Sequence, residues 1–322
     1  MNPLQDLALH PVLATVQLAA DEFLHMASGT TRFDEEAAYH RVLSSVHAIC
    51  AAIVDCENAG LTRAEIIEVL EPVRAVHRRS PFVERLQTWP EGYPGDFRTI
   101  EYLCRGTNAA PEGTVEYHCE QYALTRAIAQ QHRNKVHLQA MRILQTMLEK
   151  PGASRILSIA CGSCPDLRLL PNLDSIAGEI WLNDADDNAL AFARARLASV
   201  DSRLRLVRGM VPRSTMKLRE QFDLVVAGGL FDYLSERQAI FLIRDILNRL
   251  LVPGGSFYFT NIAEGNPYRP LIEYLGDWRL LERSEDEMLR YCEAAGASRE
   301  QVHISRDATN LALIIEVTAT DR

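Results

Sequence analysis

The fold is decided by the stretch Ser154-Arg-Ile-Leu-Ser-Ile-Ala-Cys-Gly-Ser-Cys-Pro-Asp-Leu167 and by Glu179-Ile-Trp-Leu-Asn-Asp184, which follows it. A short apolar run over Arg155 to Ala160 predicts a buried strand, and this run ends at small residues. Pro165 suits the first turn of a helix, because the N–H that it lacks would have no partner there. The order of strand, glycine turn, helical piece and second strand is typical of a doubly wound α/β sheet.

An acidic residue stands at the carboxyl end of the second predicted strand. In a doubly wound sheet, Asp184 at that place can accept hydrogen bonds from the two hydroxyls of a ribose. The glycine pattern is incomplete, because Cys164 and Asp166 stand where a nucleotide fingerprint would have its second and third glycines. The glycine motif alone is therefore weak evidence, and Asp184 strengthens it.

The rest of the C-terminal half continues the alternation of strands and helices. Apolar runs and helical spacing predict, in chain order, a strand over 222–227, a helix over 236–251, a strand over 256–262 after the break Pro253-Gly-Gly255, and a helix over 285–295. Gln301 to Arg306 and Asn310 to Thr318 alternate and predict a terminal antiparallel hairpin. The expected fold class is α/β, a doubly wound Rossmann-like sheet with an antiparallel C-terminal hairpin.

The N-terminal part of the chain reads as helical. Apolar residues at three- and four-residue spacing predict helices over Pro11 to His25 and Glu35 to Cys56. Thr62 followed by Glu65 is a capping-box start for a third helix that runs to about His77. We expect an all-helical cap domain over residues 1–112, a connecting helix over 113–150 and the α/β domain over 151–322.

The amino-acid composition limits which classes of partner and function are expected. The 322 residues include 34 Lys and Arg against 43 Asp and Glu, a net charge of −9, which argues against a nucleic-acid partner. No apolar run long enough to span a membrane and no signal-peptide pattern appears, so we expect a cytoplasmic protein without a membrane partner. Cysteines and histidines do not recur at metal-ligand spacing, so no metal site is expected. Homo-oligomerisation stays open.

Two cysteines stand at redox-motif spacing, in Cys161-Gly-Ser-Cys164. Their small side chains are sufficiently explained by the tight turn that follows the first strand. The turn is therefore the favoured interpretation, and redox chemistry is the alternative.

Several of these segments resemble the fold of class I S-adenosylmethionine-dependent methyltransferases. The resemblance covers roughly residues 150–322, and it rests on Ile156 to Leu167, Asp184, Phe222 to Leu234 and the break at Leu251-Val-Pro-Gly-Gly255. It implies S-adenosylmethionine (SAM) as the cofactor, with Gly162 under its methionine part and Asp184 on its ribose.

The chain departs from this family at one place. Many members carry an acidic residue at the end of the first strand, where Ala160 stands here, so the methionine amino group needs another partner. Asp166 is a candidate for that role.

The connecting segment Thr114 to Lys150 is long enough for one long helix or two. Arg133-Asn134-Lys135 interrupts its amphipathic pattern at a place that would pass over the carboxyl ends of the strands, where ligands bind. Arg133 there suits the SAM carboxylate, and Asn134 suits the SAM amine or a polar group of the substrate. A solvated helix break is the structural alternative. The cofactor-binding residues that we expect are Arg133, Ala160, Cys161, Gly162, Ser163, Asp166, Asp184, Ala185, Gly209, Met210, Gly228 and Leu230.

The segment Ser80 to Phe97 is rich in prolines, glycines and aromatic residues and predicts a stiff loop. The purely structural interpretation of this segment is an interdomain connection packed by aromatic rings. Gly92-Tyr-Pro-Gly-Asp-Phe97 and Gly229-Leu-Phe-Asp-Tyr-Leu234 also look like segments of a bacterial group in which a helical cap precedes the SAM domain. That group includes methyltransferases that make hydroxy fatty acid methyl esters and synthases that cyclise SAM to azetidine-2-carboxylate, releasing methylthioadenosine.

Three functions follow from these features. Methyl transfer from a sulfonium needs a positioned nucleophile and the exclusion of water, and we expect a SAM-dependent methyltransferase that acts on a small molecule. The second reading is a SAM cyclase, since an aromatic-rich cap can hold the sulfonium. The third is a non-catalytic SAM-binding protein. The candidate catalytic residues are Tyr93, Asp96, Asn134 and Tyr233.

Overall fold

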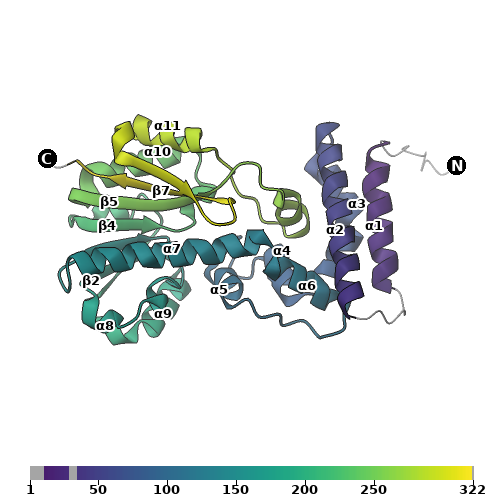
Figure 1. The fold of residues 1–322 in the computed structure, drawn as a ribbon, viewed down its shortest axis with the longest axis horizontal. Helices are drawn as coiled ribbons and strands as arrows, with labels where there is room; N and C mark the ends of the chain where they lie inside the picture. Colours follow the sequence, from purple (N-terminus) through teal and green to yellow (C-terminus); the bar gives the residue numbers. More distant parts are fainter. Residues whose placement is uncertain (1–10, 29–34, 321–322) are drawn as a thin grey trace. The chain divides into compact units, whose positions relative to one another are not determined.

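The computed structural model describes residues 11–28 and 35–320, and Figure 1 shows the course of the chain. The chain divides into two compact units. The helical unit comprises residues 1–126 and 267–279, and the sheet unit comprises residues 127–266 and 280–322. This division differs from the expected boundaries after residues 112 and 150, because the long helix before the first strand belongs to the sheet unit and a C-terminal segment belongs to the helical unit.

The described part of the helical unit contains six α-helices. They are α1 (Leu13–Ser28), α2 (Glu35–Asn58), α3 (Arg63–His77), α4 (Pro81–Thr88), α5 (Phe97–Arg105) and α6 (Val115–Thr125). Thr62 caps α3 in the predicted capping box with Glu65. Apolar faces of α1, α2 and α3 form one core, with Phe23, Ile49, Ile53 and Leu70 completely buried.

The prediction of a loop over Ser80 to Phe97 is wrong for its first half, which is α4. Ser80 is the N-cap, its hydroxyl accepts the Val83 N–H at 3.2 Å, and Pro81 begins the helix. A serine followed by proline is a helix-start signal, and the composition of the whole segment obscured it. The turn after α4 leads to Asp96, which is the N-cap of α5.

Helix α2 is long and apolar enough to span a membrane by length and composition alone. Core helices also meet this criterion. In the helical unit, Val42, Val46, Ile49 and Ile53 of α2 lie in the buried core.

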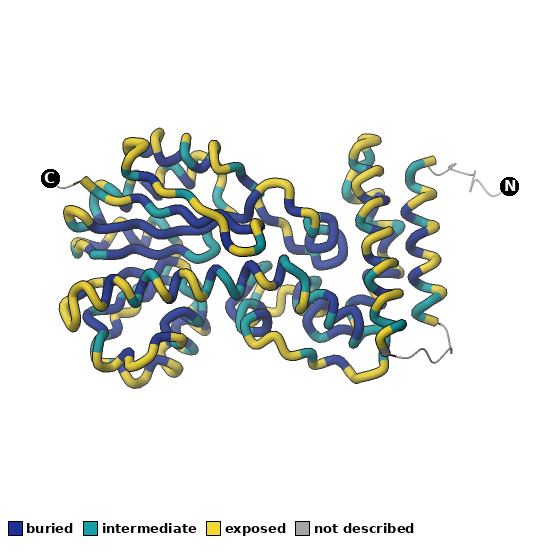
Figure 2. Tube along the Cα trace, in the orientation of Figure 1, coloured by how far each residue is buried: buried dark blue, intermediate teal, exposed yellow. Residues whose placement is uncertain are grey.

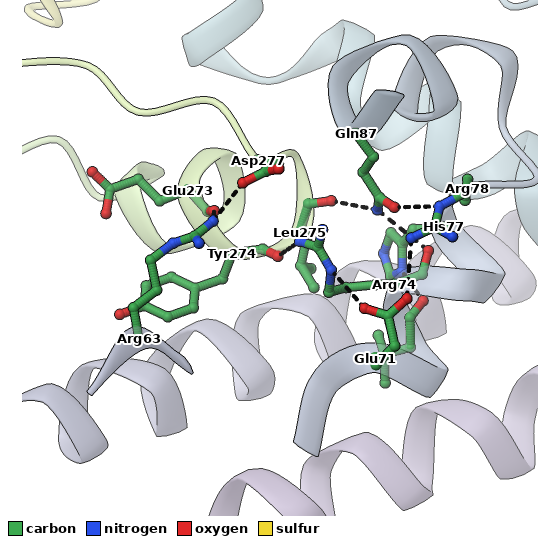
Figure 3. Close-up of polar contacts among 11 residues, drawn as sticks. Arg63, Glu71, Arg74, His77, Arg78, Gln87, Glu273, Tyr274, Leu275 and Asp277 are labelled. Atoms are coloured by element: carbon green, nitrogen blue, oxygen red, sulfur yellow. Dashed lines mark hydrogen bonds and ion pairs between the residues drawn. The ribbon is translucent and has the colours of Figure 1, made fainter. Parts of the chain in front are cut away.

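A segment from the C-terminal half completes the helical unit. Its helical turn, Leu271–Leu275, packs against α3, and the polar contacts are drawn in Figure 3. The Arg63 guanidinium donates to the Glu273 carbonyl at 2.8 Å, and Arg74 donates to the Tyr274 carbonyl. The two arginines thus supply hydrogen-bond donors to backbone carbonyl groups of the turn.

The sheet unit is built on a seven-stranded sheet of order β3-β2-β1-β4-β5-β7-β6. Strands β1 to β5 pair in parallel, whereas β7 pairs antiparallel with β5 and β6. The fold is therefore a doubly wound Rossmann-like sheet with an antiparallel C-terminal hairpin, which confirms the predicted fold class. The strands are β1 (Arg155–Ile159), β2 (Glu179–Asp184), β3 (Leu204–Arg208), β4 (Phe222–Ala227), β5 (Leu251–Ile262), β6 (Val302–Arg306) and β7 (Ala312–Thr318).

Helices cover both faces of this sheet. Figure 1 shows α10 and α11 on one face and α7, α8 and α9 on the other. Each face has its own apolar core, and the middle strands are buried along their length (Figure 2). The bounds are α7 (Ala127–Glu149), α8 (Leu173–Ile176), α9 (Asp187–Arg196), α10 (Glu236–Asp245) and α11 (Glu285–Ala295).

The connecting segment forms two helices, one of the two possibilities that the sequence left open. Helix α6 ends in the helical unit before the extended Arg126, and α7 of the sheet unit runs unbroken through Arg133-Asn134-Lys135. The expected start of the fifth strand at Ser256 is corrected. Strand β5 begins at Leu251 and continues through Pro253-Gly-Gly255, where the predicted break is a shift of register against β4. An irregular strand accommodates the proline and glycines without ending.

Candidate functional site

The turn after β1 folds back tightly at the carboxyl edge of the sheet. Ala160, Gly162 and Cys164 all have left-handed backbone conformations, with φ of 47°, 54° and 51°. The Cys161 N–H donates to the Asn183 carbonyl of β2 at 3.0 Å, which ties the turn to the neighbouring strand. The left-handed conformation costs a non-glycine residue about 1 kcal/mol or more, so Ala160 and Cys164 store strain at this edge.

Asp184, the last residue of β2, binds the same turn. One oxygen, Oδ2, accepts the Gly162 N–H at 2.8 Å, and Oδ1 accepts the Asp186 N–H at 2.9 Å. Burial raises the pKa of the Asp184 carboxyl, and the backbone hydrogen bonds from Asp186, Gly162 and Ala185 only partly offset this. Since a carboxylate has about four acceptor positions, acceptor capacity is left for a further donor.

Asp166 forms a second buried carboxylate of the turn. Its Oδ1 accepts the Leu167 N–H at 2.8 Å, and its Oδ2 accepts the amide Nε2 of Gln139 on α7 at 2.6 Å. Burial raises the pKa of Asp166, while the hydrogen bonds from Gln139 and Leu167 lower it. This carboxylate therefore also keeps acceptor capacity in a site shielded from water.

Gly228, at the end of β4, lies against the same glutamine. A Cβ atom built on Gly228 would lie 2.6 Å from Gln139 Oε1. The Thr260 hydroxyl donates to the Gly228 carbonyl at 2.7 Å, which fixes the backbone there. The side chain of Gln139 thus connects the turn after β1 with the end of β4, at the point where the strand order reverses.

The side chains of Arg133, Asn134 and Lys135 on α7 each bind a different partner. Asn134 donates to Asp307 Oδ2 at 2.8 Å, and Arg133 donates to Gln130 Oε1 at 2.9 Å. Lys135 is buried, with Nζ 3.3 Å from Asp232 in the turn after β4. The solvated helix break weighed as an alternative is therefore excluded here, while the expected contacts of Arg133 and Asn134 with SAM stay predictions.

The end of β3 adds a third loop to this edge. The Gly209 N–H donates to the Asp184 carbonyl at 2.8 Å, and the Asn183 amide donates to the Gly209 carbonyl at 2.9 Å. Gly209 has φ of 132°, which favours glycine, and Met210 after it is 74% exposed. The loops after β1, β2 and β3 are therefore held together by the backbone and by Asn183.

Residues 156–255 match the family model described as a methyltransferase domain. The sheet unit contains a methyltransferase domain. No curated protein matches the chain.

Several solved structures are similar to this chain at low sequence identity. A possible exported protein from Bordetella parapertussis has a TM-score of 0.58 at 15% identity, covering 97% of this chain and 100% of that one. The magnesium protoporphyrin IX methyltransferase from Synechocystis PCC 6803, with bound S-adenosylhomocysteine, has a TM-score of 0.45 at 11% identity, covering 61% of this chain and 88% of that one. The glycopeptide N-methyltransferase MtfA, complexed with SAM, has a TM-score of 0.42 at 19% identity, covering 58% of this chain and 94% of that one.

The other expected site residues of the methyltransferase domain lie on the loops after β1, β2 and β4. In the turn after β1, Cys161 is half-buried and Ser163 is buried. Ala185 directly follows β2 and is exposed. Leu230 and Tyr233 bound the helical turn after β4, where Tyr233 is 41% exposed. Their contacts with a cofactor or substrate stay predictions.

Two expected catalytic residues, Tyr93 and Asp96, belong to the helical unit. Asp96 is buried and caps α5, with Oδ1 accepting the backbone N–H groups of Arg98 and Thr99 and Oδ2 accepting the Thr99 hydroxyl. Asp96 also pairs with Arg85 at 2.8 Å. These contacts give Asp96 a structural function within the helical unit, and its catalytic role stays a prediction.

Sequence reasoning missed three residues of the methyltransferase domain. Gln139 and Lys135 stand four residues apart on α7 and are both buried, although glutamine and lysine are usually exposed. Asn183 is buried and directly follows the apolar run Ile180-Trp-Leu182 of β2. A polar residue inside an apolar pattern was the available signal in each case. Among residues 11–28 and 35–320, no cluster of three or more histidine, cysteine or carboxylate side chains forms a metal site.

Proposed function

We propose that the protein is a SAM-dependent methyltransferase that acts on a small molecule and binds SAM at the carboxyl ends of β1, β2 and β4. The observation that carries this proposal is the carboxylate of Asp184. It is anchored by the N–H groups of Gly162 and Asp186, with a further backbone hydrogen bond from Ala185, and keeps acceptor capacity for another donor. The methyltransferase-domain match over residues 156–255 supports the same site.

The residues of this edge fit the parts of SAM. Asp184 would accept the ribose hydroxyls, and the left-handed turn at Gly162 would let the methionine part approach the backbone closely. Asp166 would take the ammonium group, because it is a buried carboxylate and both the Gln139 amide and the Leu167 N–H that donate to it are uncharged. When bound, SAM supplies a methyl group activated by its sulfonium.

The chain itself has to hold the acceptor in line and keep water away from it. Asp232 is poorly suited to act as a general base, because Oδ1 accepts the Ile262 N–H at 2.6 Å and Oδ2 pairs with Lys135. A carboxylate acceptor would need no base. The net charge of −9 favours a small molecule over nucleic acid as the acceptor.

Incubating the purified protein with SAM alone and analysing the products by mass spectrometry tests this proposal. We expect SAM to stay intact until a small acid, alcohol or amine is added, and S-adenosylhomocysteine to appear then. Methylthioadenosine with a four-membered cyclic amino acid, above a no-enzyme control, would support the SAM cyclase instead. Binding of S-adenosylhomocysteine without turnover of any acceptor would favour a non-catalytic SAM-binding protein.

A further inference from the structure

One amide side chain connects two loops of the proposed SAM site. Gln139 Nε2 lies 2.6 Å from Asp166 Oδ2, and both side chains are buried, with 8% and 2% exposed. Because Nε2 is the donor, the acceptor Oε1 is at the other end of the amide plane, beside Gly228. The orientation of the amide is therefore set by contacts on both sides.

The carboxylate of Asp166 depends on this donor. Burial disfavours the charged form of Asp166. Among the contacts that favour this charged form, the hydrogen bond from Gln139 has the largest effect. The Leu167 N–H binds the other oxygen, Oδ1, whereas the side chain of Gln139 donates to Oδ2. Removing the amide donor would leave Oδ2 free to rotate and the carboxyl easier to protonate.

We propose that Gln139 is a positioning residue that holds Asp166 charged and correctly turned for the ammonium group of SAM. This inference rests on the proposed function. Gln139 would affect the binding only of ligands that carry the amino acid part of SAM. The nucleoside part would be held by Asp184, which lies at the end of β2 and does not depend on Gln139. The proposal therefore predicts a change in selectivity between two ligands, which general destabilisation of the fold would not produce.

Gly228 provides an independent way to move the same side chain. Its φ is outside the left-handed region, so alanine suits the backbone there. The new Cβ would lie 2.6 Å from Gln139 Oε1, and the three nearest atoms all belong to that flexible side chain. Gly228→Ala should therefore displace the Gln139 amide from Asp166 without touching Asp166 itself.

The test compares S-adenosylhomocysteine, which has the amino acid part, with methylthioadenosine, which lacks it, by calorimetry on the full chain. Gln139→Met keeps the side-chain length and removes the donor. We expect about tenfold weaker binding of S-adenosylhomocysteine, with binding of methylthioadenosine changed by less than about twofold. The matched control is Gln145→Met, an exposed glutamine on the same helix, which should change neither ligand.

Gly228→Ala should give the same selective loss, which keeps the proposal testable if Gln139→Met fails to fold. In a Gln139→Ala background the clash is gone, so adding Gly228→Ala should weaken S-adenosylhomocysteine no further. Equal losses for both ligands, or no change in either variant while the wild type binds both, would overturn the role of Gln139. If the wild type binds neither ligand, the proposed function fails first, and this inference fails with it.

Discussion

Lys135 Nζ lies 3.3 Å from Asp232 Oδ2 inside the sheet unit, where only 4% and 3% of the two side chains are exposed. The pair joins α7 to the helical turn Leu230–Tyr233 that follows β4. The other oxygen of Asp232 accepts the Ile262 N–H of β5 at 2.6 Å. One carboxylate therefore fixes the turn against a helix and a neighbouring strand.

Lys135→Met should lower the free energy of unfolding by about 3 to 5 kcal/mol, because it leaves the Asp232 charge buried without its partner. Urea denaturation measures this loss. Lys150→Met is the matched control, since Lys150 pairs with Asp223 at 2.5 Å but is 56% exposed, and it should cost about 1 kcal/mol or less. Equal losses in the two variants would contradict a special role for the buried pair.

Gln131 is completely buried on α7, and neither its amide oxygen nor its amide nitrogen has a hydrogen-bond partner among the described residues. An unsatisfied buried amide costs about 1 to 3 kcal/mol, so Gln131→Met should raise the melting temperature. Gln130→Met is the control, because the exposed Gln130 bonds to Asn134 and Arg133 and gains nothing from the change. A lower melting temperature for Gln131→Met would show that the amide is satisfied in solution.

His77 makes the stability of the helical unit depend on pH. Burial lowers the pKa of His77 to about 4, opposed by its hydrogen bond to the Val73 carbonyl and assisted by the charge of Arg74. The unfolded chain takes up a proton near pH 6.5, whereas the folded chain does not until about pH 4. The contribution of His77 to the free energy of unfolding is therefore fully present above about pH 6.5, and about 3 kcal/mol of it is lost as the pH drops to 4.

His77→Phe removes this proton uptake and keeps an aromatic ring against Phe23, whose centroid lies 4.8 Å from that of His77. The free energy of unfolding, measured by urea titration between pH 4 and 6.5, should then change less steeply with pH. The exposed His303, replaced by glutamine, is the control and should leave the slope unchanged. An unchanged slope in His77→Phe would rule out His77 as the source.

Cys161 and Cys164 should behave as unreactive thiols. The hydrogen bond from Cys164 lowers the pKa of Cys161, but burial and the charges of Asp184 and Asp166 outweigh it. The hydrogen bond to Cys161 and burial raise the pKa of Cys164. Because the thiolate is the nucleophile, iodoacetamide at pH 7.5 should label both slowly in peptide mapping. Rapid labelling, or a disulfide formed under mild oxidation, would favour the redox alternative.

Local signals in the sequence predicted much of the fold. Thr62 and Glu65 form the predicted capping box, and α11 and β4 have the predicted bounds. The edge strand β3 was not predicted, since Leu204-Arg-Leu-Val-Arg208 is neither a continuous apolar run nor a regular alternation. The return of the segment around Tyr274 to α3 depends on contacts some two hundred positions apart, such as that of Arg74, which no local pattern reveals.

The residues of the candidate site were predictable where local sequence signals mark them, and not where they depend on contacts between distant segments. Asp184 lies at the end of β2, as its place after an apolar strand indicated. The hydrogen bond from Gln139 to Asp166 was not predictable, because it needs the helix, the turn and the end of β4 together. Helical periodicity identifies a buried face, but it does not identify the partner of a polar residue on that face.

Titration of S-adenosylhomocysteine into the wild type, Asp184→Ala and Asp187→Ala by calorimetry tests the central claim most directly. We predict one saturable site in the wild type and a loss of about 1 to 3 kcal/mol in Asp184→Ala, from the missing ribose hydrogen bonds. Asp187, an exposed neighbour paired with Arg208, is the control and should keep wild-type affinity. No binding by the wild type, or equal affinity in wild type and Asp184→Ala, would contradict the proposed SAM site.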